Sequence, residues 1–206
     1  MTLLCDIAFK YGTDKCPNIK HSFTPFYYQL LKDQAAKFKK VLEIGVGLKR
    51  QHSHSPQNTQ AAGLYMWREF FPQAQIYGAD VDPQLVFTDN RITTFLCDQS
   101  SKTDLQALIK KTGSDLDLVI DDGSHIPAQQ IFTCLTLMPL LAKNVLYIIE
   151  DVRDPGILLS LGKYDCQEII PENSRFPDDR LIIVKHKHDP QSLRHSALKK
   201  RKLSHS

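Results

Sequence analysis

Short apolar runs alternate with amphipathic segments along most of the chain. A short apolar run bounded by turn residues is typical of a buried strand, and such runs are found at 41–47, 75–83, 91–100, 116–125 and 145–152. Apolar residues at helical spacing predict helices before and between these runs, at 26–40, 61–72, 101–113 and 127–143. This alternation predicts a parallel sheet with helices on both faces.

Two further apolar runs near the C-terminus, 165–172 and 180–187, predict strands that pair antiparallel. The polar segments 10–25 and 51–60 predict loops. The segment from about Pro190 lacks apolar periodicity, which is typical of a disordered tail. The whole pattern predicts an α/β fold: a Rossmann-like, doubly wound and mostly parallel sheet with a C-terminal antiparallel strand pair.

The composition is that of an ordinary globular chain. The 206 residues are 42% hydrophobic and 24% charged, which suits one domain with a sizeable core. The five cysteines are scattered without a CxxC pair, so we expect no disulfide framework and no structural zinc site, and a cytoplasmic location. No apolar run approaches the roughly 20 residues of a membrane span, and we expect no secretory signal.

The net charge of +3 is unevenly distributed. From Lys185 onward the chain has seven of its 26 basic residues and one of its 23 acidic ones, so the preceding body is net acidic. The basic run Lys199–Lys202 has no interleaved aromatic residues for base stacking, and a solvated terminus is the favoured interpretation. Nucleic acid is therefore not the partner that we expect.

Each predicted parallel strand ends in carboxylates. The strand ends carry Glu43, Asp80 and Asp82, Asp98, Asp121 and Asp122, and Glu150 and Asp151. In open α/β sheets, ligands bind outside the carboxyl ends of the strands. Because gathered carboxylates repel one another, we expect a cation, a hydroxyl-rich ligand or both at this edge of the sheet.

A glycine pair follows the first predicted strand. Gly45 and Gly47 permit a positive φ and a close approach of ligand to backbone, as a nucleotide-binding loop requires. The segment is not the dinucleotide fingerprint, because Lys49 and Arg50 stand where a third glycine is needed. A tight strand-to-helix turn is the alternative for the pair alone. Asp80 favours the nucleotide, because an acid at the end of the next strand is placed to bind ribose hydroxyls.

The acids of the last two parallel strands form the strongest candidate site. Asp122, Glu150 and Asp151 are hard oxygen donors, which suit Mg²⁺, Mn²⁺ or Ca²⁺ rather than zinc. His125 lies three residues after Asp122 in a Gly-Ser turn and is a candidate general base. Taken singly, each acid is better explained as a helix N-cap or a solvated loop residue. Together with the histidine, they favour a site.

The motifs VLEIGVG, IYGADVDP, LCDQS, LDLVIDDGSH and LYIIEDV, in this order, resemble those of the class I S-adenosylmethionine-dependent methyltransferases. More narrowly, they resemble the metal-dependent macrolide sugar O-methyltransferases of the mycinamicin type. The YGTDK…H…T…YY segment and the WREFFP helix resemble that group too, so the similarity runs from about Ala8 to Val184. One departure is AAGL before the tryptophan, where the group has a glycine-rich GxSL.

The resemblance implies roles for individual residues. For S-adenosylmethionine it implies Glu43, Gly45 and Gly47 at the methionine end, Asp80 at the ribose, Asp98 and Gln99 at the adenine, Asp121 as a further cofactor residue, and Tyr11 and Thr13 in a lid loop. For Mg²⁺ or Mn²⁺ it implies the ligands Asp122, Glu150 and Asp151, with His125 and Asp122 as the catalytic pair. It divides the chain into a lid loop and helix (1–40), a Rossmann-like methyltransferase domain (41–189) and a basic tail (190–206).

The implied activity is a divalent-metal-assisted O-methyl transfer to a hydroxyl of a small molecule, a sugar or a glycosylated natural product. Two alternatives stay open: a catalytically impaired S-adenosylmethionine-binding protein, suggested by the irregular segment 48–63, and an RNA methyltransferase that uses the basic tail. A nicotinamide dehydrogenase is less favoured, because the third glycine is absent. The sequence is compatible with a homo-oligomer and does not specify one.

Overall fold

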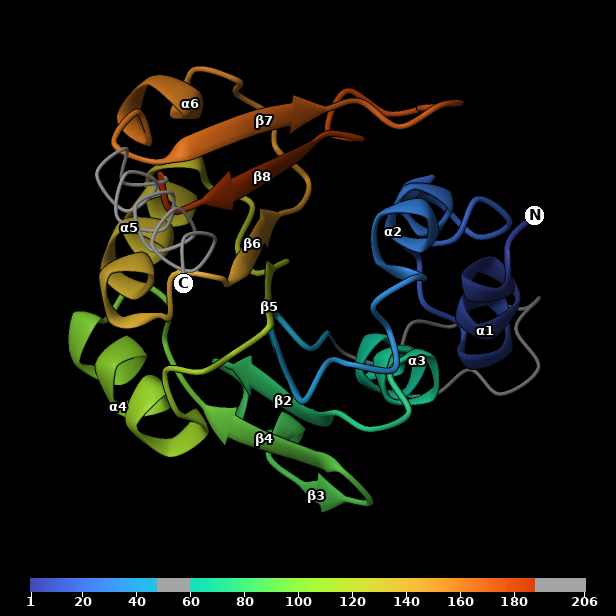
Figure 1. The fold of residues 1–206 in the computed structure, drawn as a ribbon, viewed down its shortest axis with the longest axis horizontal. Helices are drawn as coiled ribbons and strands as arrows, with labels where there is room; N and C mark the ends of the chain where they lie inside the picture. The colour runs from blue at the N-terminus through green and yellow to red at the C-terminus, as the bar shows by residue number, and fades with distance from the viewer. Residues whose placement is uncertain (48–59, 188–206) are drawn as a thin grey trace, which may run out of the picture.

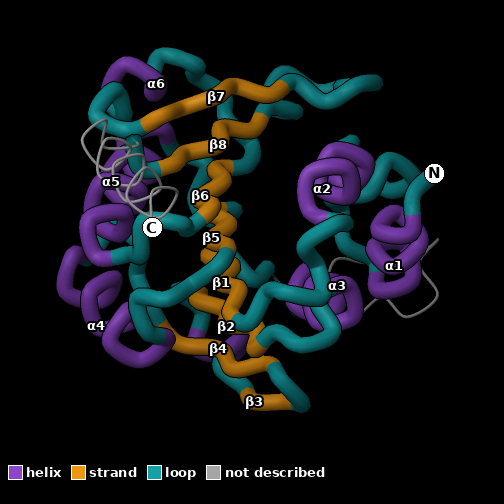
Figure 2. Tube along the Cα trace, viewed as in Figure 1, coloured by secondary structure: helices purple, strands orange, loops and turns teal. Residues whose placement is uncertain are grey.

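The computed structural model describes residues 1–47 and 60–187. These residues form an eight-stranded sheet in the order β3-β4-β2-β1-β5-β6-β8-β7 (Figures 1 and 2). Its strands are β1 (Lys40–Ile44), β2 (Gln75–Asp80), β3 (Thr88–Asp89), β4 (Ile92–Leu96), β5 (Leu118–Asp121), β6 (Leu146–Ile149), β7 (Asp165–Ile169) and β8 (Leu181–Lys185). The predicted loop 51–60, apart from its last residue, and the predicted tail 190–206 lie outside the described residues.

The strand pairing confirms the predicted fold class. β1 pairs parallel with β2 and β5, and the parallel set extends to β4 on one side and β6 on the other. β8 pairs antiparallel with both β6 and β7, as predicted for the C-terminal strands. The chain runs outward from β1 to β4 and then returns to β5, so the order of the strands reverses between β1 and β5. In such sheets a ligand crevice opens at this reversal point.

Helices cover both faces of the sheet (Figure 2). One face is covered by α1 (Leu3–Tyr11), α2 (Phe23–Leu31) and α3 (Ala62–Phe70), and the other by α4 (Lys102–Thr112), α5 (Pro127–Leu137) and α6 (Ile157–Ser160). Short 3₁₀ helices lie at Pro83–Leu85 and Met138–Leu140. Successive strand residues point to opposite faces, so Val41 packs in the cluster with Trp67 of α3 while Leu42 packs with Leu137 of α5.

The helices α1 and α4 begin and end where the sequence supplies capping residues. Ser101 caps α4 by accepting a hydrogen bond from the backbone N–H of Asp104, and Gly113 ends that helix with φ +88°. The helix α1 was not predicted, although it has similar signals: the Thr2 side chain caps its start, and Gly12 ends it with φ +85°.

The helix predicted over 26–40 differs in the structure, where α2 begins at Phe23 and ends at Leu31. Turns follow it, with Gln34 and Lys37 donating backbone hydrogen bonds to carbonyls three residues earlier. Phe38 stacks on Phe71, with 5.1 Å between the ring centroids, before the chain enters β1. Packing against the end of α3 therefore outweighs the helical spacing of this segment.

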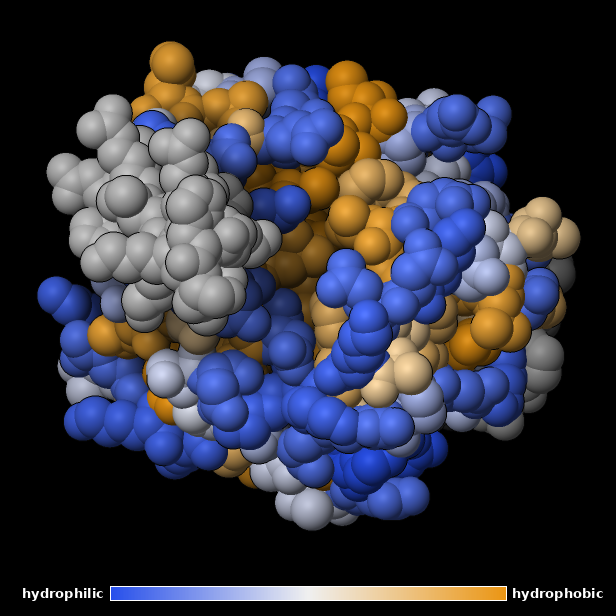
Figure 3. Space-filling model, viewed as in Figure 1, coloured by the Kyte–Doolittle hydropathy of each residue, from blue (hydrophilic) through white to orange (hydrophobic). Residues whose placement is uncertain are grey.

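Among the described residues, no helix combines the length and the apolar character needed to cross a bilayer. Figure 3 shows hydrophilic residues over much of one face, with hydrophobic residues in a hollow between the C-terminal strand pair and α2.

Candidate functional site

A cavity of about 190 Å³ opens at the carboxyl ends of the parallel strands, where the strand order reverses. Predicted site residues in its lining are Thr13, Glu43, Gly45, Gly47, Asp80, Asp122, His125 and Asp151. A second cavity of about 200 Å³ is lined by Asp98, Gln99 and Ser124, and shares Gly45, Asp80 and Gly123 with the first. The two cavities are therefore neighbours across the glycine turn, and together they form one elongated site.

The glycine turn after β1 lies against the end of β5. Gly45 and Gly47 have φ of +85° and +74°, the left-handed region that glycine occupies at no steric cost. A Cβ on Gly45 would lie 2.1 Å from the carbonyl oxygen of Asp122. The Asp80 carboxylate accepts the backbone N–H groups of Val46 at 2.9 Å and Gly47 at 3.4 Å. Asp80 thus holds the turn in the shape that lines both cavities.

We expect Gly45→Ala to be clearly more destabilising than Gly47→Ala. Both variants carry the cost of a left-handed alanine, roughly 1–2 kcal/mol, but only the Gly45 variant also forces away the backbone of Asp122 and Gly123, just after β5. A Cβ on Gly47 meets no described atom within 4 Å. Urea unfolding of the two variants measures the difference. Equal losses of unfolding free energy would contradict the close contact between the turn and β5.

Lys15 lies at the centre of the acidic rim, which consists of the carboxylates of Glu43, Asp122 and Glu150 at the ends of β1, β5 and β6. Its Nζ forms ion pairs with Glu43 Oε1 at 3.2 Å, with Glu150 Oε2 at 2.6 Å, and with Asp122 Oδ2. Burial lowers the pKa of Lys15, but the three carboxylates outweigh it and hold that pKa well above its usual value. The same burial raises the pKa of Glu43 to about 7, against the pull of Lys15. One ammonium group therefore links the ends of β1, β5 and β6.

Glu150 is engaged at both carboxylate oxygens. Its Oε1 accepts a hydrogen bond of 2.6 Å from the hydroxyl of Tyr27, and its Oε2 accepts one from Lys15. Burial raises the pKa of Glu150 well above the usual range. The buried amide of Gln130 donates to the Glu150 backbone carbonyl at 2.9 Å. Glu150 is thus fixed by α2, α5 and the loop that carries Lys15.

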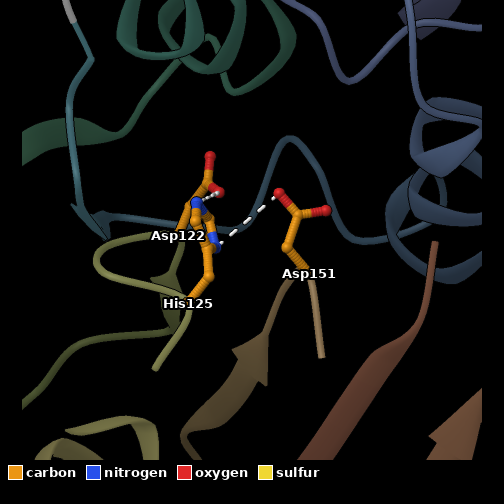
Figure 4. A group of neighbouring side chains, drawn as sticks. All are labelled: Asp122, His125 and Asp151. Carbon is orange, nitrogen blue, oxygen red and sulfur yellow. Dashed lines mark ion pairs between the residues drawn. The ribbon is translucent and has the colours of Figure 1, made fainter. Parts of the chain in front are cut away.

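The remaining predicted catalytic and metal residues, Asp122, His125 and Asp151, come together in the first cavity (Figure 4). One ligand atom from each of the three lies within 4.8 Å of the others. His125 Nε2 lies 3.9 Å from Asp122 Oδ1, and His125 Nδ1 lies 3.7 Å from Asp151 Oδ2. Burial, followed by the charge of Asp122, raises the pKa of Asp151 to about 6. Two carboxylates and an imidazole this close are a donor set that fits a cation.

The backbone at this cluster is strained. His125 and Asp151 have φ of +54° and +51°, two of the five positive-φ residues other than glycine in the described chain. Left-handed backbone costs such residues free energy and is concentrated at functional sites. With this backbone, both side chains line the same cavity. Pro127 begins α5 just after the His125 turn.

The turn that carries His125 is supported from behind by Gln99. The Gln99 Oε1 accepts the backbone N–H of Ser124 at 2.6 Å, and its Nε2 donates to Asp121 Oδ1 at 3.3 Å. Asp121 also accepts a hydrogen bond from Tyr147, and burial raises its pKa to about 7. Gln99 lines the second cavity, whereas Asp121 lies behind the turn and lines neither cavity.

The predicted lid residues are divided between two environments. Thr13 lines the first cavity together with Lys15, whose ammonium group pairs with Glu150. Tyr11 is outside the lining of both cavities and donates its hydroxyl proton to Glu69 at 2.7 Å. Asp98, which lines the second cavity, accepts hydrogen bonds from the hydroxyl and backbone N–H of Ser100, and they lower its pKa.

No protein-family model matches the chain. The chain is 35% identical over 149 residues to mycinamicin VI 2''-O-methyltransferase of Micromonospora griseorubida, covering 72% of the chain and 36% of that protein. It is 32% identical over 162 residues to 8-demethyl-8-alpha-L-rhamnosyl tetracenomycin-C 2'-O-methyltransferase of Streptomyces olivaceus, covering 79% and 41% respectively. The chain therefore spans less than half the length of each of these two relatives.

A similar solved structure is that of the methyltransferase MycE from the mycinamycin biosynthetic pathway, in complex with Mg, SAH and mycinamycin VI. It is 28% identical to the chain, with a TM-score of 0.72, over 91% of the chain and 55% of the solved chain. The similarity thus covers nearly all of this chain and little more than half of the solved one.

Proposed function

The chain belongs to the class I S-adenosylmethionine-dependent methyltransferases, and we propose that it transfers a methyl group to a sugar hydroxyl of a small molecule with the help of a divalent cation. The observation that carries this proposal is the convergence of the glycine turn, the acidic rim and His125 in one cavity. The relatives named above support the acceptor class, because their names describe 2''-O-methyl transfer to mycinamicin VI and 2'-O-methyl transfer to a rhamnosyl tetracenomycin.

The elongated site fits S-adenosylmethionine. Glu43, Gly45 and Gly47 line the first cavity, and we propose that the methionine end of the donor lies beside them. We propose Asp80 for the ribose hydroxyls and Asp98 with Gln99 for the adenine, since the latter two line the second cavity. We propose that Thr13 is the lid residue that contacts the donor. Tyr11 and Asp121 line neither cavity and would act by supporting residues that do.

The metal site that we propose consists of Asp122, Asp151 and Glu150, with Mg²⁺ or Mn²⁺ as the ion. Asp122 and Asp151 already face one cavity, each with one oxygen beside the His125 ring, and two carboxylates this close fit a site for a cation. Glu150 completes the proposed set, although its oxygens are bonded to Tyr27 and Lys15. When bound, the ion supplies positive charge beside the acceptor hydroxyl, and the donor supplies an electrophilic methyl group.

His125 is the proposed general base. Its Nδ1 is buried beside Asp151 without a hydrogen-bond partner, so Nε2 is the nitrogen left to take the proton of the acceptor hydroxyl. Asp122 and Asp151 lie on either side of the ring, where they orient it and stabilise the imidazolium that forms. The residues 12–15 line the cavity, where they would help to exclude water from the reacting groups once both substrates are bound.

A methyl-transfer assay with a glycosylated macrolide or a rhamnoside as acceptor tests this function. We expect activity that a chelator abolishes and that added Mg²⁺ or Mn²⁺ restores, because a divalent ion beside the acceptor hydroxyl would favour its deprotonation. Calorimetry with S-adenosylhomocysteine is the control, since donor binding should persist in the chelator. Activity that is indifferent to the chelator would contradict the metal site, and donor binding without transfer to any sugar would favour the impaired-enzyme alternative.

We also propose that the reaction takes place in the cytoplasm. All five cysteines are free, and four of them are buried, which suits a reducing compartment.

A further inference from the structure

A second histidine, His21, lies behind the proposed metal site and has no role in the function derived above. It belongs to the loop between α1 and α2, and it is 1% exposed. Its Nδ1 bonds to Asp179 Oδ1 at 2.5 Å, and its Nε2 faces Asp151 Oδ1 at 3.7 Å. The ring therefore stands between two carboxylates that come from distant parts of the chain.

Asp179 fixes the orientation of this ring. Its other oxygen, Oδ2, accepts the backbone N–H groups of Arg175 at 2.5 Å and Phe176 at 2.9 Å. Burial raises the pKa of Asp179, but the bond from His21 and these two backbone bonds outweigh it and lower the pKa overall. An ionised carboxylate only accepts hydrogen bonds, so Nδ1 of His21 donates to it. The ring also stacks on Phe23, with 4.9 Å between centroids.

The ring nitrogen that faces Asp151 makes no hydrogen bond to any described residue. His21 Nε2 and Asp151 Oδ1 are both buried, and within the described part of the chain neither has a hydrogen-bond partner. Unsatisfied buried polar atoms are rare and costly in native proteins. Two of them facing each other at 3.7 Å, at the edge of a proposed cation site, indicate a contact that shortens when Asp151 is engaged.

We propose that His21, held by Asp179, is a positioning residue that orients Asp151 for the divalent cation. This inference rests on the proposed metal-assisted function. Histidine and carboxylate partners behind metal ligands commonly change metal affinity by about 10- to 100-fold. His21 Nε2 faces Asp151 Oδ1 at 3.7 Å, which leaves Oδ2, on the His125 side, for the ion.

Two substitutions of His21 separate positioning from a purely structural role. Asparagine can reproduce the Nδ1 donor and keep the bond to Asp179, but it is too short to reach Asp151. Glutamine places its amide near the position of Nε2 and can still donate to Asp151. Phe23→Leu is the matched control, because it weakens the packing under the same ring without touching either carboxylate.

The measurement is Mn²⁺ affinity by titration calorimetry on the full chain, with S-adenosylhomocysteine affinity and thermal unfolding recorded for each variant. We expect His21→Asn to weaken Mn²⁺ binding at least about tenfold and to leave S-adenosylhomocysteine binding unchanged. His21→Gln should recover most of the metal affinity. In turnover assays, His21→Asn should raise the metal concentration needed for half-maximal rate while largely preserving the rate at saturation.

Unchanged Mn²⁺ affinity in His21→Asn, or an equal loss in Phe23→Leu, would overturn the inference and leave His21 a structural residue. Failure of the proposed function gives a different result: the unmodified chain would itself bind no Mn²⁺ while still binding S-adenosylhomocysteine. In that case the metal site and the role of His21 are both rejected. Should His21→Asn not fold, Asp179→Asn replaces it, because this change weakens the hold on the ring and keeps the imidazole.

Discussion

Replacing His125 with asparagine is expected to lower the turnover number by about 10²- to 10⁴-fold, the usual contribution of a general base. Asparagine is the informative choice because it tolerates the left-handed backbone that His125 adopts at φ +54°. The variant therefore removes the imidazole without adding backbone strain. The measurement is kcat with saturating Mg²⁺ and a glycosylated acceptor.

Binding of S-adenosylhomocysteine to the His125→Asn variant serves as the control and should match that of the unmodified chain. His125→Ala, by contrast, combines loss of the base with a left-handed alanine, and some loss of stability is expected. A turnover number within tenfold of the original for the asparagine variant would remove His125 from the mechanism. The base would then have to be sought among the other residues of the cavity.

Replacing Lys15 with methionine is expected to destabilise the fold by about 3–5 kcal/mol, the usual result of leaving a buried ionic partner uncompensated. Methionine keeps the length and most of the apolar contacts of the side chain, so the change isolates the charge. Glu43 and Glu150 are both buried, and without the ammonium they lose the cation that they share with Asp122. Urea unfolding at neutral pH measures the loss.

Lys10→Met is the matched control for this experiment. Lys10 forms an ion pair of 2.6 Å with Glu69, but both side chains are substantially exposed, at 42% and 37%. Surface pairs of this kind contribute little to stability, so the control should unfold almost as the unmodified chain does. A divalent cation should stabilise Lys15→Met more than the unmodified chain, because it supplies the missing positive charge. Equal stability of the two lysine variants would show that the rim does not depend on Lys15.

The arrangement of the sheet and of its rim was predictable because both follow from local pattern. Apolar runs of strand length that end in acids define β1, β2 and β5, and parallel strands bring such ends to one edge. The structure accordingly gathers Asp80, Asp122 and Asp151 around one cavity. Which of them bind donor, metal or substrate stays a prediction.

The contacts that hold this rim were not predictable from the sequence. Lys15 lies 107 residues before Asp122 and 135 before Glu150, and Tyr27 lies 123 residues before Glu150. Nothing in the local pattern of residues 12–22 distinguishes a buried lysine or histidine from solvated ones. Local sequence signals do not predict how a loop folds back over a sheet, since only tertiary packing decides which of its side chains are buried.

The loop between α1 and α2, together with α2 itself, contributes Lys15, His21 and Tyr27 to the far ends of β5 and β6. None of these residues belongs to the sheet or to the helices between its strands. A version of the chain shortened to begin at β1 would retain every proposed ligand of the metal, yet its carboxylates would lose the cation, the phenol and the imidazole that surround them. Shortened versions of the chain must therefore be designed from α1 onward, not from the first strand.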